Sequence, residues 1–453
     1  MITLLAIDWA VVGIKAVQLI LCLSILVVLH EMGHFLPAKW FKCRVEKFYL
    51  FFDPWFSLAK KKIGETVYGI GWLPLGGYVK ISGMVDESMD KEQMKQPPQP
   101  WEFRSKPAWQ RLIIMVGGVT VNLLLGFFLF AMILFVWGDK YLPTQNLKYG
   151  IYVDSLGKRI GLQDGDKILT IDGKPQKDFS KISADIILKE AKTIQVDRNG
   201  QVLNLSIPSG TTSGLIKRKG DPIAFPKYPA VVDSVSSQAK FVAGSLQKGD
   251  MIVGLNQYPV RSFAELQDIK RNYKDKQVEL TVLRNERDTA KVKVQLNKEA
   301  GIGFYSRPAD QFLDFATEEY SLLQSLPAGV KKGWNTLVMN VQNFKLLFTS
   351  KEVKASESLG SFLSIGNMFG EEWDWQRFWG MTALLSIVLA FMNILPIPAL
   401  DGGHVLFTLY EMITGRKPGD KFMEYAQMAG MALLLGLMAY ALGLDFWRFL
   451  FKG

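Results

Sequence analysis

Four long apolar stretches dominate this sequence. Residues 16–29 and 112–136 contain no charged side chain, and two further uncharged stretches cover residues 378–400 and 428–444. A helix needs about 20 apolar residues to cross a hydrocarbon layer about 30 Å thick. With its flanking residues each stretch is long enough, so the sequence predicts a polytopic α-helical membrane protein with four transmembrane helices.

The average composition indicates that these stretches are only part of the molecule. Hydrophobic residues make up 49% of the 453 residues, and the mean hydropathy is only +0.11. A chain embedded throughout would score much higher, so the segment between the second and third stretches is expected to be soluble. A cleaved signal peptide is the alternative for the first stretch. It is disfavoured because the apolar residues lead directly into His30 and Glu31, without a small-residue cleavage site.

The basic residues predict the orientation of the chain. They concentrate after the first and third stretches, at Lys39, Lys42, Arg44, Lys47, Lys60, Lys61, Lys62, Lys80, Arg104, Lys106 and Arg111, and then at Arg416, Lys417 and Lys421. Basic loops stay in the cytoplasm, so both termini and residues 138–375 are expected on the outer side. A lipid surface also accounts for the net charge of +10, and nucleic-acid binding is therefore disfavoured.

The long outer segment contains an internal repeat. Residues 162–173 (LQDGDKILTIDG) match residues 246–257 (LQKGDMIVGLNQ) at an offset of 84 residues. Each copy is typical of a turn, an alternating strand and a second turn. The pattern resembles tandem PDZ domains, α+β domains that bind extended peptides along a sheet edge. Residues 301–304 (GIGF) resemble their carboxylate-binding loop, and a plain turn is the alternative.

Residues 311–375 are predicted to be helical and amphipathic. Apolar side chains recur at steps of three and four residues, at Leu322, Leu326, Val330, Trp334, Leu337, Val341 and Phe344. We expect a helix that lies on the bilayer or covers the spans. A fifth crossing is disfavoured because Lys331, Lys332 and Asn335 would lie inside it.

The first apolar stretch ends in the motif His30-Glu31-Met32-Gly33-His34. Residues four apart on a helix lie on one face, about 40° from each other, so both imidazoles can bind one zinc ion. Glu31 lies beside them and can take a proton from the attacking water. Structural core histidines are the alternative. They are disfavoured because ionisable side chains at membrane depth are costly and usually functional.

Two histidines leave zinc in need of a third protein ligand. Cys22 and Cys43 lie at poor spacings, and the best candidates follow the third stretch, where two prolines break the helix. Irregular backbone at membrane depth is tolerated only where protein or a water-filled cavity covers it. Asp401 or His404 can complete the site, and chemistry alone does not choose between them.

The HExxH motif in the first span, combined with NxxPxPxLDG at residues 393–402, resembles the site-2 protease family of intramembrane zinc metalloproteases. The resemblance covers nearly the whole chain. It implies that His30, His34 and Asp401 bind Zn²⁺, that Glu31 is the catalytic base, and that His404 is only a neighbour. The implied organisation is a first transmembrane helix (1–41), a cytoplasmic segment with a membrane-associated β-loop (42–108), a second transmembrane helix (109–138), two inserted PDZ-like domains (139–222 and 223–308), an amphipathic helical segment (309–375), a third transmembrane helix (376–401), and a cytoplasmic loop with the fourth transmembrane helix (402–453).

The resemblance also implies substrate-binding residues. Asn393 and Pro398 fall on family positions that hold the unwound substrate. Residues 69–79 resemble the family's re-entrant β-loop, in which Gly69 and Gly71 permit tight turns and an edge can pair with an extended substrate. An ordinary cytoplasmic hairpin is the alternative.

One departure from the family pattern lies in the second span. Relatives carry Gly-Pro ahead of an asparagine, whereas this chain has Gly117-Gly118 ahead of Asn122. The missing proline changes the expected start of that helix and leaves the role of Asn122 open. The zinc ligands are unaffected.

The resemblance implies a multi-pass protease of the bacterial inner membrane, with the PDZ-like domains and both termini in the periplasm. Its implied substrates are single-span membrane proteins of the anti-sigma-factor type, cut in an envelope stress response, and remnant signal peptides. Its other partners are membrane lipids, without nucleic acid. Two alternatives remain: a membrane-tethered zinc peptidase that cuts soluble proteins, and a catalytically silent PDZ scaffold.

Overall fold

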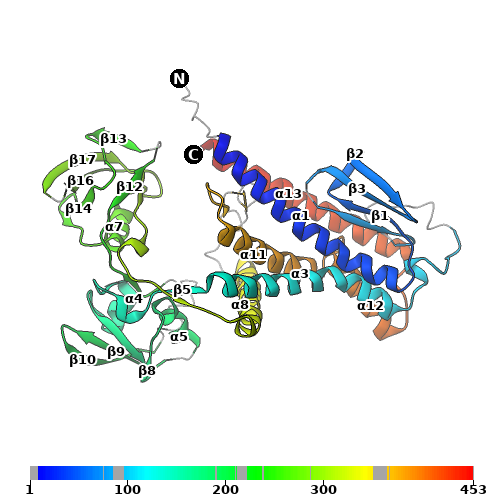
Figure 1. The fold of residues 1–453 in the computed structure, drawn as a ribbon, viewed down its shortest axis with the longest axis horizontal. Helices are drawn as coiled ribbons and strands as arrows, with labels where there is room; N and C mark the ends of the chain where they lie inside the picture. The colour runs from blue at the N-terminus through cyan, green and yellow to red at the C-terminus, as the bar shows by residue number, and fades with distance from the viewer. Residues whose placement is uncertain are drawn as a thin grey trace. The chain divides into compact units, whose positions relative to one another are not determined.

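The computed structural model describes residues 9–74, 76–84, 96–188, 191–209, 211, 222–236, 239–285, 287–349, 365–366 and 368–451. The chain divides into two compact units, which we describe separately (Figure 1). The helical unit consists of Met1–Gly138 and Glu319–Gly453, and the strand unit is Asp139–Glu318.

Long helices form the helical unit because its apolar stretches satisfy their backbone hydrogen bonds within the helix. Its helices are α1 (Trp9–Trp40), α3 (Ala108–Trp137), α8 (Leu322–Thr349), α11 (Trp375–Asn393), α12 (Asp401–Thr414) and α13 (Asp420–Phe451). Within the described residues, three segments are long and apolar enough to cross a membrane: Trp9–Trp40, Ala108–Trp137 and Lys421–Leu444. They match three of the four predicted spans, and the fourth crossing stays a prediction.

The third predicted span is shorter as a helix than its apolar stretch. Helix α11 ends at Asn393, and residues 394–400 form irregular turns before α12 begins at Asp401. Pro396 and Pro398 have no backbone N–H, and each clashes with the preceding turn of a helix. Ala399 has a φ of 79°, which an α-helix excludes. The chain therefore reaches Asp401 through a non-helical turn.

A four-stranded sheet completes the helical unit. Its strands are β1 (Val45–Leu50), β2 (Phe52–Ile63), β3 (Thr66–Leu73) and β4 (Tyr78–Ile81). Their order is β2-β3-β1-β4, in which β1 and β3 are parallel and the other pairs antiparallel. Among the described strands β4 pairs only with β1, so its other edge carries no neighbouring strand.

The sheet is fixed to the helices by a shared apolar core. Ala38 of α1, Val45 of β1, Ile81 of β4, Ile114 of α3 and Val405 of α12 belong to one buried cluster. Burial of such side chains stabilises the packing by about 1.5–3 kcal/mol each. The sheet is thereby held rigidly beside the HExxH end of α1.

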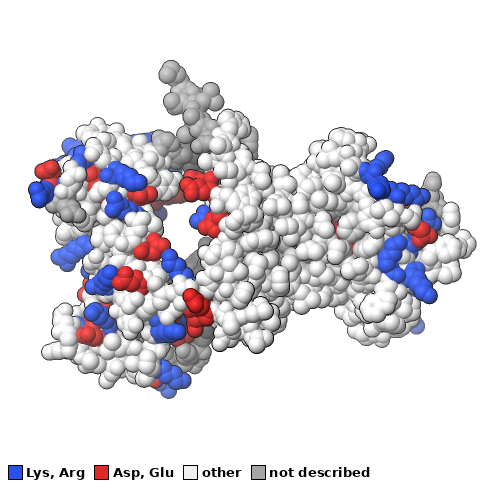
Figure 2. Space-filling model, viewed as in Figure 1, with Lys and Arg blue, Asp and Glu red and all other residues white. Residues whose placement is uncertain are grey.

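Charge is unevenly distributed over the helical unit. Figure 2 shows an almost uncharged surface over the long helices, with Lys and Arg gathered at the end that carries the sheet. Lys60, Lys61 and Lys62 lie exposed on β2 near Trp55, whose side chain is 91% exposed. An apolar belt bordered by Trp and Lys is typical of a protein that crosses a bilayer.

The strand unit contains two similar halves. The first half has β6 (Ile151–Val153), α4 (Ser155–Ile160), β7 (Lys167–Ile171), β8 (Lys174–Pro175), α5 (Ile182–Leu188), β9 (Thr193–Arg198), β10 (Gln201–Ser206) and β11 (Ala224–Pro226). The second has β12 (Val232–Val235), β13 (Lys240–Ala243), β14 (Met251–Leu255), β15 (Tyr258–Pro259), α7 (Phe263–Lys270), β16 (Gln277–Arg284), β17 (Asp288–Gln295) and β18 (Phe304–Ser306). Each half has its own apolar core. At the ends of the unit, β5 (Asp139–Tyr141) pairs with β19 (Ala316–Glu318).

The sequence repeat is also a structural repeat. In the first half Arg198 donates hydrogen bonds to both carboxylate oxygens of Asp166, and in the second half Arg284 does the same to Asp250. Both aspartates are almost fully buried. A bidentate arginine–carboxylate pair therefore fixes the same turn in each half.

The two halves of the strand unit touch through side chains. The ring of Tyr228 stacks on Phe263 and on Phe312, and the hydroxyl of Tyr152 donates to Asp268 at 2.7 Å. The GIGF segment leads into β18, which pairs with β12. Its predicted role as a carboxylate-binding loop stays a prediction.

Candidate metal centre

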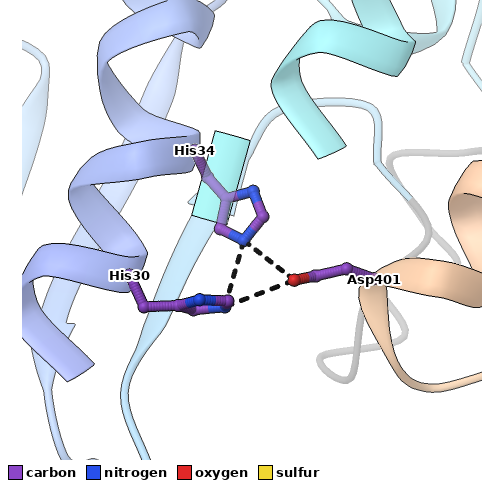
Figure 3. A group of neighbouring side chains, drawn as sticks. All are labelled: His30, His34 and Asp401. Carbon is purple, nitrogen blue, oxygen red and sulfur yellow. Dashed lines mark hydrogen bonds and ion pairs between the residues drawn. The ribbon is translucent and has the colours of Figure 1, made fainter. Parts of the chain in front are cut away.

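Three metal-binding side chains converge where α1 and α12 meet (Figure 3). His30 and His34 lie one turn apart on α1, and their ring centroids are 4.9 Å apart. Asp401 is the first residue of α12. Over the described part of the chain, these three residues are the one group of at least three His, Cys, Asp or Glu side chains that can hold a metal ion.

The three ligand atoms form a nearly equilateral triangle. The Nε2 atoms of His30 and His34 are 3.3 Å apart, and each lies 3.3 Å from Oδ2 of Asp401. A tetrahedral zinc site with ligand distances of about 2.0–2.1 Å has edges of about 3.3–3.4 Å. Oδ2 of Asp401 is buried without a hydrogen-bond partner. The donor set and its spacing therefore fit one face of a zinc tetrahedron.

Glu31 lies beside the triangle without joining it. Its side chain is buried, and its carboxyl group lies within hydrogen-bonding reach of the backbone of Val79 on β4. A Cβ added at Gly77 would come within 3.4 Å of its Cγ. The unpaired edge of β4 thus runs directly past the carboxyl group that the sequence predicts to be the base.

Helix α3 supports both imidazoles from behind. Nδ1 of His34 lies 2.8 Å from the backbone oxygen of Ile114 and donates to it, which leaves Nε2 free to bind a metal. Nδ1 of His30 lies 3.2 Å from the side-chain amide of Asn122. Ser386 of α11 donates to the backbone oxygen of Asn122 at 2.7 Å.

Glycines allow α3 to approach α1 so closely. A Cβ at Gly117 would overlap the backbone oxygen of Gly33, and a Cβ at Gly118 would overlap the imidazole of His34. Gly117 and Gly118 are helical residues in the middle of α3. The missing proline therefore leaves this part of the helix intact, and the glycine pair serves close packing.

Contacts with neighbouring residues fix both ends of α12. Near Asp401, a Cβ at Gly403 would come within 2.7 Å of Pro398. In the last turn of α12, Glu411 forms an ion pair with Arg111 of α3, and both side chains are largely buried. The aspartate thus projects from a helix whose position is fixed by its neighbours.

The structure brings only some of the other predicted residues to the triangle. The amide of Asn393 lies 3.3 Å from Nε2 of His30, whereas Pro398 packs against Gly403 and Gly430. His404 lies outside the triangle. Residue chemistry left Asp401 and His404 as alternatives, and the family resemblance implied Asp401. The structure places Asp401 with the histidines.

Gly69 and Gly71 lie in β3, inside the sheet. Gly69 pairs with Tyr49 on one side and Lys60 on the other, and Gly71 pairs with Ser57. Their predicted contact with substrate stays a prediction, and the edge next to the triangle belongs to β4. Two features of the sequence could have pointed to β4 and to Asn122. Gly77, which lies beside Glu31, directly precedes β4, and Asn122 is the one amide side chain in the uncharged stretch 112–136.

A cavity of about 540 Å³ opens beside the triangle. It is bordered by the triangle itself, Glu31, Tyr78 and Leu400. This volume is within the range of about 300–1,000 Å³ that is usual for ligand sites. The cavity lies between the β4 edge and the start of α12, so a chain bound along β4 would pass Glu31.

Known proteins resemble this chain over most of its length. A family model described as Peptidase family M50 matches residues 18–437. The regulator of sigma E protease of Haemophilus influenzae is 27% identical over 95% of this chain and 98% of its own, and metalloprotease MmpA of Caulobacter vibrioides is 26% identical over 96% of both. Relatives from Treponema pallidum and Neisseria meningitidis, at 26% and 28% identity over 93% and 95% of this chain and 96% and 98% of theirs, carry zinc metalloprotease in their names.

Proposed function

Because the chain belongs to peptidase family M50, the site-2 protease family of zinc metalloproteases, we propose that His30, His34 and Asp401 hold its zinc ion and that Glu31 is the catalytic base. The observation that carries this proposal is the 3.3 Å triangle of ligand atoms beside a buried glutamate. A zinc ion bound there polarises the scissile carbonyl and makes water more acidic.

The chain's own residues do the proton chemistry. Glu31 takes a proton from the attacking water as the water oxygen bonds to the carbonyl carbon. It then gives that proton to the leaving amine as the C–N bond breaks. The amide of Asn393 lies beside His30, and in the proposed role it donates a hydrogen bond to a substrate carbonyl. We assign Asn393 to substrate binding, and Pro398 to shaping the turn that precedes Asp401.

The proposed substrates are membrane-spanning segments. A peptide bond within a helix is shielded by its own backbone, so the segment must unwind before it can be cut. An unwound segment can add as a strand to the free edge of β4. The backbone hydrogen bonds that it forms there replace those lost from its helix. Gly69 and Gly71 support this role by allowing β3 to pack closely within the sheet.

The name of one relative supports a proposal about the biological substrates. One relative is named regulator of sigma E protease, and we propose that this chain likewise cuts anti-sigma-factor-type single-span proteins in an envelope stress response, and remnant signal peptides. We place it in the bacterial inner membrane with four crossings: the three long apolar helices and α11, which is the third crossing along the chain. The strand unit, as two PDZ-like domains, and both termini then lie in the periplasm.

The test is the position of the cut. The purified chain is reconstituted in liposomes with a model single-span substrate, and the products are mapped by mass spectrometry, with a zinc-chelated sample as control. The expected cut lies inside the apolar span and disappears on chelation. A cut confined to a soluble flank would overturn the proposal in favour of a membrane-tethered peptidase.

A further inference from the structure

Asn122 is a buried amide whose side chain is only half satisfied. The residue lies in the middle of α3 and is 0% exposed. Its Nδ2 lies 3.2 Å from Nδ1 of His30, while its Oδ1 is buried without a hydrogen-bond partner. Leaving a buried polar atom unpaired costs about 1–3 kcal/mol. The oxygen and nitrogen of this amide must therefore be assigned from the groups around them.

The ring tautomer that metal binding requires of His30 decides which end of the amide faces it. Nε2 of His30 points into the triangle, at 3.3 Å from both His34 and Asp401. To bind a metal, Nε2 must be bare, so the ring proton of neutral His30 must be on Nδ1. An Nδ1–H group needs an acceptor, and an amide nitrogen cannot accept. The oxygen and nitrogen of an amide occupy nearly the same volume, so rotating the side-chain amide by half a turn gives this N–H group its acceptor.

We propose that Asn122 turns its Oδ1 toward His30, accepts the Nδ1–H hydrogen bond and thereby fixes the ring in its metal-binding tautomer. This inference rests on the proposed zinc site. It makes α3 the support of both rings, since the backbone oxygen of Ile114 already accepts from His34. Asn122 is a positioning residue, because it acts on the reaction only through His30.

The position of Asn122 is itself well fixed. The hydroxyl of Ser386 donates to its backbone oxygen from α11, and Gly118, one turn earlier, brings α3 against both imidazoles. Hydrogen-bond partners of this kind typically contribute 10–100-fold to metal affinity. This role also explains why an amide side chain occurs within the apolar stretch 112–136.

The experiment measures zinc binding by the full-length protein in detergent, by competition with a chromogenic chelator. Asn122→Leu has the same shape but no acceptor, and Asn122→Asp keeps an acceptor at the same place. Thr382→Val, which removes a buried hydrogen bond within α11 at nearly constant side-chain volume, is the control. We expect Asn122→Leu to bind zinc at least about tenfold more weakly, while Asn122→Asp and Thr382→Val stay within about threefold of wild type.

Each outcome decides a different question. Equal zinc affinity of Asn122→Leu and wild type, or an equal loss in Asn122→Asp, would overturn the role of Asn122. A wild type that binds no zinc would overturn the proposed zinc site itself. If Asn122→Leu does not fold, ¹⁵N-histidine NMR of the zinc-loaded wild type decides, because the chain has only three histidines. An Nδ1 proton of His30 that is protected from exchange with water, as expected of a hydrogen-bonded N–H group, supports the inference, and an Nδ1 proton that exchanges freely overturns it.

Discussion

At the scale of single residues, the candidate site depends on Gly118 of α3, which has no side chain. A Cβ at Gly118 would meet Nε2 of His34 and Cε1 of His30, the two rings whose positions set the triangle. Interiors are close-packed, so such an overlap is relieved by displacing the rings or the helix. Glycine at this position therefore permits the ligand geometry.

Gly118→Ala is expected to lower zinc affinity at least about tenfold, because overpacking costs about 1–3 kcal/mol and the displaced atoms are the ligands. The measurement is chelator competition on the purified protein. Gly380→Ala in α11 is the matched control, since no atom lies within 4 Å of the Cβ it adds. Unchanged affinity in Gly118→Ala would show that the rings tolerate the extra methyl group.

The sequence pattern predicts some residues of the candidate site better than others. His30, Glu31 and His34 are neighbours on one helix, so their spacing alone predicts a shared metal. Asp401 is 371 positions from His30, and residue chemistry left it level with His404 until the family resemblance and the geometry chose. The contact between Asn122 and His30 depends on how two helices pack, which no local pattern encodes.

At the scale of elements, the same limit applies to the sheet. The glycine-rich segment predicted a β-loop, and the structure contains strand β3 there. The strand order β2-β3-β1-β4, however, which no local pattern encodes, makes β3 internal and β2 and β4 the two edges, and β4 is the edge that contacts α1. The repeat was easier to recognise, because Asp166 and Asp250 occur in matching local motifs. Their partners, Arg198 and Arg284, lie 32 and 34 positions further along the chain on the neighbouring strands β9 and β16, so no local motif predicts them.

These matched pairs allow a pH prediction. Burial by itself raises the pKa of Asp250, but hydrogen bonds from Arg284 and the Gln247 backbone outweigh it and leave the pKa below its usual value. A lowered pKa in the folded state stabilises the fold above the unfolded pKa of about 3.9, and this stability is lost as the pH falls through the folded value.

Asp250→Asn should therefore destabilise β14 by about 1.5–3 kcal/mol near neutral pH, with the difference from wild type shrinking below about pH 4. Hydrogen–deuterium exchange of the full-length protein, corrected for intrinsic rates, measures it. Asp166→Asn is the internal control and should affect β7 in the first half instead. A loss in β14 that is the same at pH 7 and pH 3 would contradict the linkage.

At the scale of the whole molecule, the distribution of basic residues predicts how the chain is oriented in the membrane. Only two cysteines are present, Cys22 and Cys43, and both are buried, so single cysteines introduced on the surface can be labelled selectively. Glu65 in the β2–β3 turn and Lys298 in the strand unit are both exposed. They report the two proposed sides of the membrane.

In spheroplasts of a bacterial host, a membrane-impermeant maleimide should label Lys298→Cys, and should label Glu65→Cys only after lysis. The reason is that basic loops remain cytoplasmic, which places the strand unit outside. The unmodified chain is the control for background. Labelling of Glu65→Cys in intact spheroplasts would reverse the proposed topology.

The measurement that tests the account most directly is the effect of Glu31→Gln on cleavage of a single-span substrate in liposomes, with zinc content determined on the same samples. Gln keeps the size of the side chain and removes its basicity. Zinc content should stay at the wild-type level while the cleavage rate falls by about 10²–10⁴-fold, the usual contribution of general acid–base catalysis. Cleavage by Glu31→Gln within about tenfold of wild type would contradict the assignment of Glu31 as the base at this centre.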